Sequence, residues 1–158
     1  MKIRKYEAKD RQALINILRL NTPEFFVPSE EQDFLQYLER DSQNYFIIEE
    51  AKTIIGSGGF NYGFENGKTA RISWGMIHPE WHGKGVGTKL TRYRIGEIKK
   101  NWEISKIQVR TTQVVYRFYE KQGFLLEKIE KDYWAPGFDL YQMKIDIERS
   151  ESAENRFL

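Results

Sequence analysis

The sequence predicts a single α/β (α+β) domain built on a mixed, mostly antiparallel sheet of about seven strands, flanked by about four helices. Its 158 residues are the length of one ordinary domain, and 40% of them are hydrophobic, which is enough to form a core. The apolar periodicity indicates, in chain order, one strand, two helices, three strands, a helix, a strand, a short helix and two strands. Three strands in a hairpin run, followed by a strand–helix–strand crossover, require antiparallel and parallel pairs in one sheet.

The N-terminal region predicts one strand and two helices. Residues 2–6 alternate between polar and apolar side chains, which is typical of a strand, and residues 8–20 place apolar side chains at helical spacing. Two prolines interrupt this pattern in residues 21–31, because the residue before a proline disfavours helical geometry. Ser29 is then expected to cap a second helix. The apolar side chains of that helix are Phe34, Leu35 and Leu38.

Strands and turn signals dominate the rest of the chain. The turn before residue 69 contains Asn66-Gly67, a dipeptide typical of tight hairpins. Gly123 is the expected end of the short helix, because glycine readily adopts the left-handed conformation there. The predicted elements are strands at 44–50, 53–63 and 69–78, a helix from about 86 to 100, a strand at 106–112, a helix at 114–122, and a closing hairpin of 124–134 and 138–147.

Composition excludes several classes of protein. No repeat or linker divides the chain, so residues 1–147 form the predicted domain and residues 148–158 a polar C-terminal tail. The 25 basic and 23 acidic residues leave a net charge of +2, which offers no broad positive field for nucleic acid. The absence of cysteine excludes disulfides, thiolate metal sites and cysteine nucleophiles. No segment has the pattern of a signal peptide or a spanning helix, so we expect a cytoplasmic protein that does not bind membranes.

A glycine-rich turn follows the strand that ends near His78 and opens a helix near Val86. Gly83, Gly85 and Gly87 permit positive φ angles, so successive N–H groups can converge on a phosphate at the positive end of the helix. The spacing fits neither the dinucleotide fingerprint, which needs a third glycine further on, nor the Walker A loop, because here lysine follows threonine. The alternative is a turn that only reverses the chain. Three basic side chains nearby are candidates for phosphate contact: Lys84, Lys89 and Arg92.

Two motifs together resemble those of one known family. The stretch HGKGVG at residues 82–87 resembles the acyl-CoA loop of the GNAT superfamily of N-acetyltransferases, Q/R-x-x-G-x-G/A, with His82 in place of glutamine or arginine. The stretch FYEKQGF at residues 118–124 resembles the other hallmark of the family, and it follows at the expected distance and in the expected order. The resemblance spans nearly the whole chain. It implies a GNAT-like domain whose sheet is splayed where the acyl donor binds.

The resemblance also implies roles for individual residues. Tyr119 matches the tyrosine that acts as general acid on the leaving thiol, although its helical spacing alone fits a core aromatic as well. Tyr116 is the substitute for that role. Thr112 stands where the family often has an asparagine that contacts the donor, and Gln113 lies beside it. The residues expected to bind acetyl-CoA are Met76, Ile77, His78, His82, Gly83, Lys84, Gly85, Val86, Gly87, Thr88, Thr112 and Tyr116.

The strand before the glycine-rich turn is expected to present its main chain to the donor, as in the family. Gly75 within this strand indicates a β-bulge or the close approach of another group, and a packing glycine fits the pattern equally. A backbone N–H near Ile77 is expected to polarise the thioester carbonyl. Arg110 and Thr111 of the next strand are expected to face this strand across the gap.

The sequence offers several candidate residues for the general base and for the acceptor pocket. Candidates for the base are Glu24, Glu65, Glu80 and His78, each of which also fits a solvated or turn-forming side chain, and an amine that enters neutral needs no base. The acceptor is expected between residues 21–31 and the closing hairpin. The aromatic candidates, which equally fit a cap over the core, are Phe25, Phe26, Tyr133 and Trp134. The acids expected to attract a cationic amine are Glu24, Asp132 and Asp139.

The resemblance therefore predicts an acetyl-CoA-dependent N-acetyltransferase, which moves an acetyl group to a primary amine by direct attack in a ternary complex. Acetyl-CoA is the expected co-substrate, with no metal. The expected acceptor is a small-molecule amine or an amine of a peptide or protein, and the family is compatible with a homodimer formed through the closing strands. Two alternatives stay open: another acyl-CoA as donor, or a non-catalytic CoA-binding sensor or interaction module.

Overall fold

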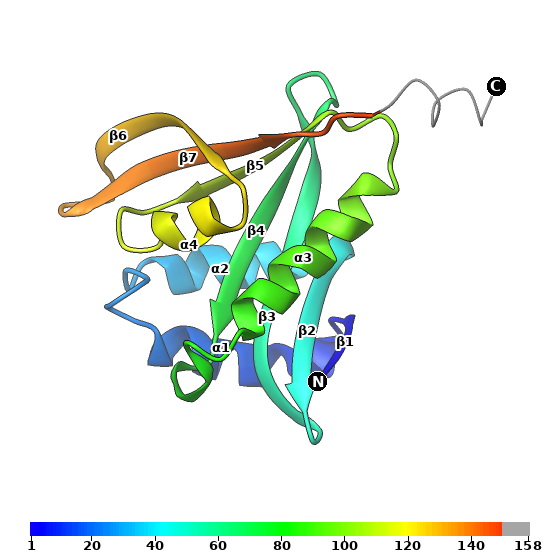
Figure 1. Cartoon of the computed structure of the whole chain (residues 1–158). Coiled ribbons are helices and arrows are strands. Elements are labelled where there is room, and N and C mark those ends of the chain that lie inside the picture. The colour runs from blue at the N-terminus through cyan, green and yellow to red at the C-terminus, as the bar shows by residue number, and fades with distance from the viewer. Residues whose placement is uncertain (150–158) are drawn as a thin grey trace.

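The computed structural model describes residues 1–149, which form a seven-stranded sheet with helices on both faces (Figure 1). The strands are β1 (Lys2–Lys5), β2 (Tyr45–Glu50), β3 (Thr53–Phe64), β4 (Thr69–Ile77), β5 (Lys106–Thr111), β6 (Leu125–Ala135) and β7 (Phe138–Asp146). The helices are α1 (Arg11–Leu20), α2 (Glu30–Arg40), α3 (Val86–Lys99) and α4 (Tyr116–Lys121), with short 3-10 helices η1 (Ala8–Asp10), η2 (Ser42–Asn44) and η3 (Pro79–Trp81). Residues 150–158 of the predicted tail lie outside the described residues.

The strand order is β1-β2-β3-β4-β5-β7-β6, and only β4 and β5 pair in parallel. The crossover between these two strands is α3, which lies across one face of the sheet (Figure 1). The predicted fold class, a mixed and mostly antiparallel sheet with four helices, is confirmed. Among residues 1–149, no helix is both long enough and apolar enough to cross a membrane.

Side chains that alternate along the strands fill two cores, one on each face of the sheet. Tyr45 and Ile47 of β2 pack against apolar residues of α1 and α2. Phe46, between them, packs on the opposite face with residues of α3 and α4, such as Ile98 and Tyr119. This alternation follows from the two-residue period of a strand, because neighbouring side chains point to opposite faces. The sheet therefore carries α1 and α2 on one face and α3 and α4 on the other.

The parallel strands β4 and β5 pair only over their first halves. Their ladder ends at the pair Ile72–Val109, and no strand among the described residues continues it along residues 73–77 of β4. β5 stays paired with β7 on its other side as far as Thr111, whereas its pairing with β4 stops at Val109. The two strands β4 and β5 therefore diverge. The main-chain groups of β4 that face the gap are left without a strand partner. The splay that the resemblance implies is therefore present.

A β-bulge on the other side of β4 accompanies this divergence. Gly58 of β3 lies opposite both Trp74 and Gly75, and Trp74 has a φ angle of 49°. The hydroxyl of the buried Tyr45 donates a hydrogen bond of 2.8 Å to the Trp74 carbonyl oxygen, which holds the unusual backbone in place. Bulges bend a strand and increase its twist, so this one turns the end of β4 away from β5. The bulge predicted at Gly75 is confirmed.

Helix α2 begins differently from the prediction. The Ser29 side chain makes no capping hydrogen bond; instead, the Glu30 carboxylate accepts one of 2.8 Å from the Val27 N–H. Ser29 therefore stands at the N-cap position, as predicted, but its side chain does not cap the helix. The buried face of α2 includes Tyr37, which the prediction left out, while Leu35 is only half-buried. The end of α2 that carries Glu30 faces the region where β4 and β5 diverge, since Glu30 lines the cavity there.

Candidate functional site

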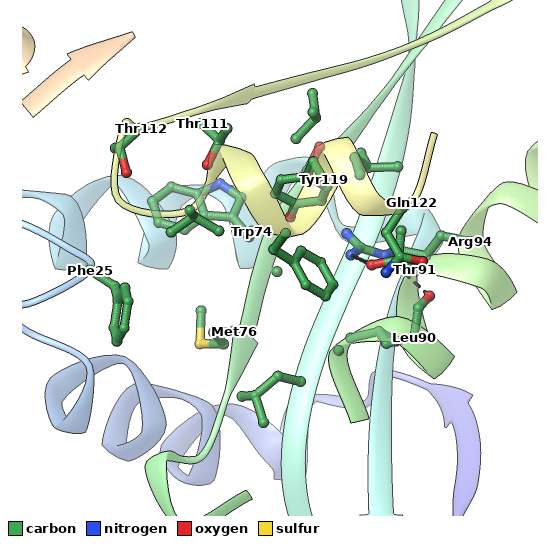
Figure 2. A pocket seen from close by; sticks show the side chains of 18 of the residues that line it. Phe25, Trp74, Met76, Leu90, Thr91, Arg94, Thr111, Thr112, Tyr119 and Gln122 are labelled. Atoms are coloured by element: carbon green, nitrogen blue, oxygen red, sulfur yellow. Dashed lines mark hydrogen bonds between the residues drawn. The ribbon is translucent and has the colours of Figure 1, made fainter. Parts of the chain in front are cut away.

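A cavity of about 750 Å³ occupies the gap between β4 and β5 (Figure 2). It extends from the glycine-rich turn before α3, past α4, to the loop between α1 and α2 and to the β6–β7 hairpin. The two sequence motifs and the predicted acceptor loops therefore border one space. The predicted site residues that line it are Phe25, Phe26, Met76, Ile77, His82, Gly83, Gly85, Gly87, Thr88, Thr112, Tyr119 and Trp134. Arg110 and Thr111, predicted to face β4 across the gap, also line it.

Several predicted site residues do not line the cavity. Among them are Glu24, His78, Lys84, Val86 and Tyr116. The Val86 side chain is buried in the core at the start of α3, so only its main chain can take part in binding. The Tyr116 ring packs against Tyr141 with 4.6 Å between ring centroids, and the Lys84 ammonium lies 5.2 Å from the centroid of the Trp81 ring. The side chains of Lys84 and Tyr116 are therefore turned to other partners.

Hydrogen bonds fix the chain where β4 passes into the glycine-rich turn. The His78 Nδ1 accepts a hydrogen bond of 3.1 Å from the Glu80 N–H, which gives His78 a turn-forming role. The carbonyl oxygen of Ile77 accepts two hydrogen bonds, one of 2.8 Å from His82 Nε2 and one of 3.0 Å from Asn21 Nδ2. His82, the departure from the family pattern, thus ties the turn back to β4. Sequence reasoning missed the buried Asn21, whose only signal is a polar residue directly after α1.

The turn itself has the geometry of an anion-binding site. Gly83 and Gly85 have φ angles of 72° and 80°, which other residues adopt only with strain. Gly85 is the N-cap of α3, and its carbonyl oxygen accepts the first helical hydrogen bond, of 3.0 Å, from the Lys89 N–H. The N–H groups of residues 86–88 therefore have no acceptor within the helix, and they stand at its positive end. The open space beside both glycines leaves room for a phosphate group.

Helix α4 is docked on the start of α3. A Cβ atom on Gly87 would lie 3.3 Å from Phe118 Cζ, so the glycine permits the close packing of the two helices. The Gln122 amide donates a hydrogen bond of 3.1 Å to the Thr88 hydroxyl. Phe118, Gln122, Gly87 and Thr88 all line the cavity, so these contacts set the position of α4 relative to the turn.

Tyr119 is buried and still borders the cavity (Figure 2). Its ring packs edge-on against Phe118 and Phe124, with centroids 5.0 Å and 5.6 Å away. Its hydroxyl approaches the bulge of β4, because a Cβ atom on Gly75 would lie 3.4 Å from that oxygen. The side chain therefore meets both expectations for it, a core aromatic and a polar group held at the cavity.

Arg94 places a buried positive charge next to Tyr119. Only 2% of Arg94 is exposed, and its guanidinium would lie 3.2 Å from a Cβ atom on Gly75, at the same glycine that the Tyr119 hydroxyl approaches. It donates hydrogen bonds of 3.3 Å to the Gly59 carbonyl oxygen and 3.4 Å to the Thr91 hydroxyl. No carboxylate among residues 1–149 pairs with it. Sequence reasoning missed Arg94, because an arginine in a helix is usually solvated.

Glu30 is the carboxylate that lines the cavity. Burial raises the pKa of its side chain, which makes it a stronger proton acceptor than an exposed glutamate. The predicted candidate Glu65 pairs with Lys106 at 3.2 Å, and Glu80 is exposed; neither lines the cavity. Within the described part of the chain, no three histidine, aspartate or glutamate side chains are grouped as metal ligands would be.

Thr112 and Gln113 organise the loop before α4. The Thr112 hydroxyl accepts a hydrogen bond of 3.2 Å from the Val114 N–H, so a turn precedes the helix and α4 begins two residues later than predicted. The Gln113 amide donates a hydrogen bond of 2.5 Å to the Gly137 carbonyl oxygen and accepts one of 2.9 Å from the Asp139 N–H. Gln113 thus ties the β6–β7 hairpin to this loop, and Thr112 remains at the cavity wall.

Aromatic side chains wall the acceptor end of the cavity. Phe26 stacks on Trp74 with 6.1 Å between centroids, and Phe25 borders the same space. The Trp134 indole donates a hydrogen bond of 3.1 Å to the Thr111 carbonyl oxygen, which fixes the hairpin over the end of β5. Four aromatic rings from three separate segments therefore line this end.

The charges at this end differ from the expectation. Glu24 is exposed, and Asp132 and Asp139 accept hydrogen bonds of 2.8 Å and 2.9 Å from main-chain N–H groups of the β6–β7 hairpin. None of the three lines the cavity. Two arginines, Arg71 and Arg110, line it instead.

Comparisons with known proteins agree with this arrangement. Residues 11–124 match the family model described as the acetyltransferase (GNAT) family. No curated protein matches the chain by sequence. Among similar solved structures is a ribosomal-protein-S18-alanine N-acetyltransferase from Escherichia coli, with 17% identity and a TM-score of 0.78 over 94% of this chain and 95% of that one. An aminoglycoside 6′-N-acetyltransferase complexed with coenzyme A has 15% identity and a TM-score of 0.77 over 96% of this chain and 100% of that one. The structure of yncA from Salmonella typhimurium with its cofactor acetyl-CoA has 18% identity and a TM-score of 0.76 over 95% of each chain. At these identities the likeness shows the fold.

Proposed function

The chain belongs to the GNAT acetyltransferase family, and from that premise we propose that it transfers the acetyl group of acetyl-CoA to a primary amine by direct attack in a ternary complex. One observation carries the proposal: a single cavity joins the glycine-rich turn at α3, the Tyr119 hydroxyl and the aromatic loops. Donor and acceptor can therefore meet in one space beside a proton donor. Similar structures include proteins named for acetylation of an aminoglycoside and of a ribosomal protein, so small and macromolecular amines are both within the proposal.

The donor half is proposed to lie along α3 and β4. The N–H groups of residues 86–88 would bind the pyrophosphate of acetyl-CoA, with Gly83 and Gly85 allowing its close approach. The unpaired edge of β4 along residues 73–77 would hydrogen-bond to the amide groups of the pantetheine arm, as an added strand does. This path leads from the turn toward the bulge at Gly75, where the Tyr119 hydroxyl lies.

Tyr119 is proposed as the general acid. In the transfer, the acceptor nitrogen forms a bond to the thioester carbonyl carbon, the carbon–sulfur bond breaks, the nitrogen loses a proton and the sulfur gains one. The Tyr119 hydroxyl would donate the proton to the sulfur, and the nearby Arg94 charge would stabilise the negative charge that develops there. A buried, weakly hydrogen-bonded cation at this position favours the transition state more than a solvated one would, because water screens it less.

Glu30 is proposed to accept the proton of the acceptor ammonium, directly or through water. It lines the same cavity, and only one of its carboxylate oxygens is engaged, by the Val27 N–H. Burial raises the pKa of this side chain, which increases its basicity.

The experiment is a measurement of free CoA release from acetyl-CoA with polyamines, amino acids, aminoglycosides and peptide N-termini as acceptors. We expect release that depends on the amine, with the acetylated amine identified by mass spectrometry. Succinyl-CoA and propionyl-CoA in place of acetyl-CoA test the alternative donors, since the turn binds the CoA part and not the acyl group. Binding of CoA without transfer to any acceptor would favour the non-catalytic sensor, and no binding of CoA at all would refute the proposal.

A further inference from the structure

We propose that the acceptor amine carries an anionic oxygen group, in the simplest case the carboxylate of an amino acid, and that Arg71 and Arg110 bind this group. The inference rests on the proposed function, because it assigns the acceptor class of that same site. It also reverses the charge expected from sequence, where acidic side chains were to attract a cationic amine. Three observations support it: the position of the two arginines, their lack of ion-paired acids, and the pairing of the nearest acids with other groups.

The two arginines lie side by side on one face of the sheet. Arg71 of β4 is in register with Gln108 of β5, and Arg110 is two residues further along β5. Residues two apart on a strand point to the same face, so both side chains project away from the core that Ile72 and Val109 form with α3 and α4. Both line the cavity, and the Arg110 guanidinium lies 5.9 Å from the centroid of the Trp134 ring at the acceptor end.

Neither arginine has an acidic partner. No carboxylate among residues 1–149 forms an ion pair with either guanidinium. The Arg71 Nε donates a hydrogen bond of 2.6 Å to the Gln108 amide oxygen, and the Arg71 Cζ lies 4.0 Å from the centroid of the Phe64 ring. Arg110 lies 4.9 Å from the centroid of the Tyr133 ring, and its Nε is buried without a hydrogen-bond partner. A buried donor without an acceptor is unfavourable, so Arg110 is held at the cavity with hydrogen-bonding capacity that the protein leaves unused.

The acids that lie nearest are already committed. Glu65 and Glu127 both form ion pairs with Lys106, at 3.2 Å and 3.3 Å. Glu127 also accepts a hydrogen bond of 2.9 Å from the Gln108 amide. Burial, and secondly the charge of Arg110, lower the pKa of Arg71, and the opposing charges of Glu65 and Glu127 do not outweigh these two effects. The site therefore carries positive charge that a bound anionic group would neutralise.

The chemistry of the two side chains selects the ligand. A guanidinium matches the planar oxygen pair of a carboxylate with two parallel hydrogen bonds, whereas a polyamine or an aminoglycoside would bring like charge to the same place. Glu30, at the same cavity, suits the ammonium of the acceptor. An amino acid supplies both charges, and the aromatic walls suit an apolar side chain.

The test compares acceptors that differ only in the anionic group: the twenty amino acids, their amides, and the corresponding primary amines without a carboxylate. We expect the wild-type protein to acetylate at least one free amino acid with kcat/KM at least tenfold above its amide and its decarboxylated amine. Arg110→Met and Arg71→Met are expected to raise KM for that amino acid about tenfold or more, with KM for acetyl-CoA within about twofold of wild type. Arg110→Lys keeps the charge without the planar guanidinium, so its KM for that amino acid should lie between those of the wild type and Arg110→Met. Arg117→Met, on the exposed side of α4, is the matched control and should leave both constants unchanged.

Each outcome decides between the proposals. Equal or better acetylation of the amides and decarboxylated amines, or arginine variants that lose activity equally on all three kinds of acceptor, would overturn the inference. So would the absence of turnover with every free amino acid. Calorimetric titration of acetyl-CoA into the same samples separates the failures: bound acetyl-CoA with transfer to neutral or cationic amines refutes only the acceptor class, whereas no binding of acetyl-CoA refutes the proposed function itself.

Discussion

Replacing Gly85 with alanine is expected to destabilise the protein, whereas the same replacement at Gly96, inside the helix that Gly85 precedes, is expected to stabilise it. Gly85 has a φ angle of 80°, a conformation that costs an L-residue about 1–2 kcal/mol. Gly96 lies inside α3, and no atom beyond its chain neighbours and the helix's own backbone lies within 4 Å of an added Cβ, so alanine there gains helix propensity of about 0.8–1 kcal/mol. For a chain of this length 1 kcal/mol corresponds to about 2–4 °C in Tm. Gly85→Ala should therefore lower Tm by about 2–8 °C, and Gly96→Ala should raise it by about 2–4 °C.

The same pair of variants separates stability from binding. An added Cβ at Gly85 meets no protein atom within 4 Å, so its methyl group would enter the space assigned to the pyrophosphate. We expect thermal unfolding to show the two opposite shifts in Tm, and calorimetric titration of CoA to show a Kd raised several-fold for Gly85→Ala and unchanged for Gly96→Ala. The reasoning would be refuted if Gly85→Ala unfolded at the wild-type temperature and bound CoA with the wild-type Kd.

Three further variants test other parts of the account. Tyr119→Phe should lower kcat about 10²-fold or more while KM for acetyl-CoA changes little, and wild-type turnover would remove Tyr119 from the role of general acid. Glu30→Gln should lower kcat/KM at neutral pH and abolish the acidic limb of its pH profile, which in the wild type should lie above the usual range for glutamate because burial raises the Glu30 pKa; an unchanged acidic limb would argue against Glu30 as base. Asp10 is buried and accepts two hydrogen bonds of 2.9 Å from Arg4, which lower the pKa of its carboxyl. Its contribution to stability is therefore complete above the unfolded pKa of about 4 and lost as pH falls through the lower folded pKa. Asp10→Asn should cost about 1–3 kcal/mol in denaturant unfolding at pH 7 and much less in strong acid, and an equal loss at both pH values would contradict this assignment.

Local patterns carried most of the fold prediction. The helical spacing in α1 depends on side chains close in sequence, so its apolar face could be derived directly. Gly83 and Gly85 in the glycine-rich turn and Gly123 after α4 have positive φ angles, as predicted, whereas Gly87 does not. The bulge at Gly75 was predictable because an isolated glycine in a strand indicates a bulge or a close approach.

The site was less predictable where it depends on packing between distant segments. Glu30 looked like an ordinary acidic residue in the first turn of a helix, and only the tertiary structure buries it at the cavity. Arg94 is buried because Gly58 and Gly75 leave room for its guanidinium, a relation between three residues far apart in sequence. The charge of the acceptor end was misjudged for the same reason, since the Asp132 carboxylate bonds to its own hairpin rather than facing the cavity.

The central claim, that acetyl-CoA binds between the glycine-rich turn and the unpaired edge of β4, is tested most directly by amide hydrogen exchange with and without acetyl-CoA. We predict protection of the N–H groups of residues 83–88 and of residues 73–77, with little change in β1 and β2, which lie across the sheet from this gap. No protection by saturating acetyl-CoA, or protection confined to other segments, would contradict the account.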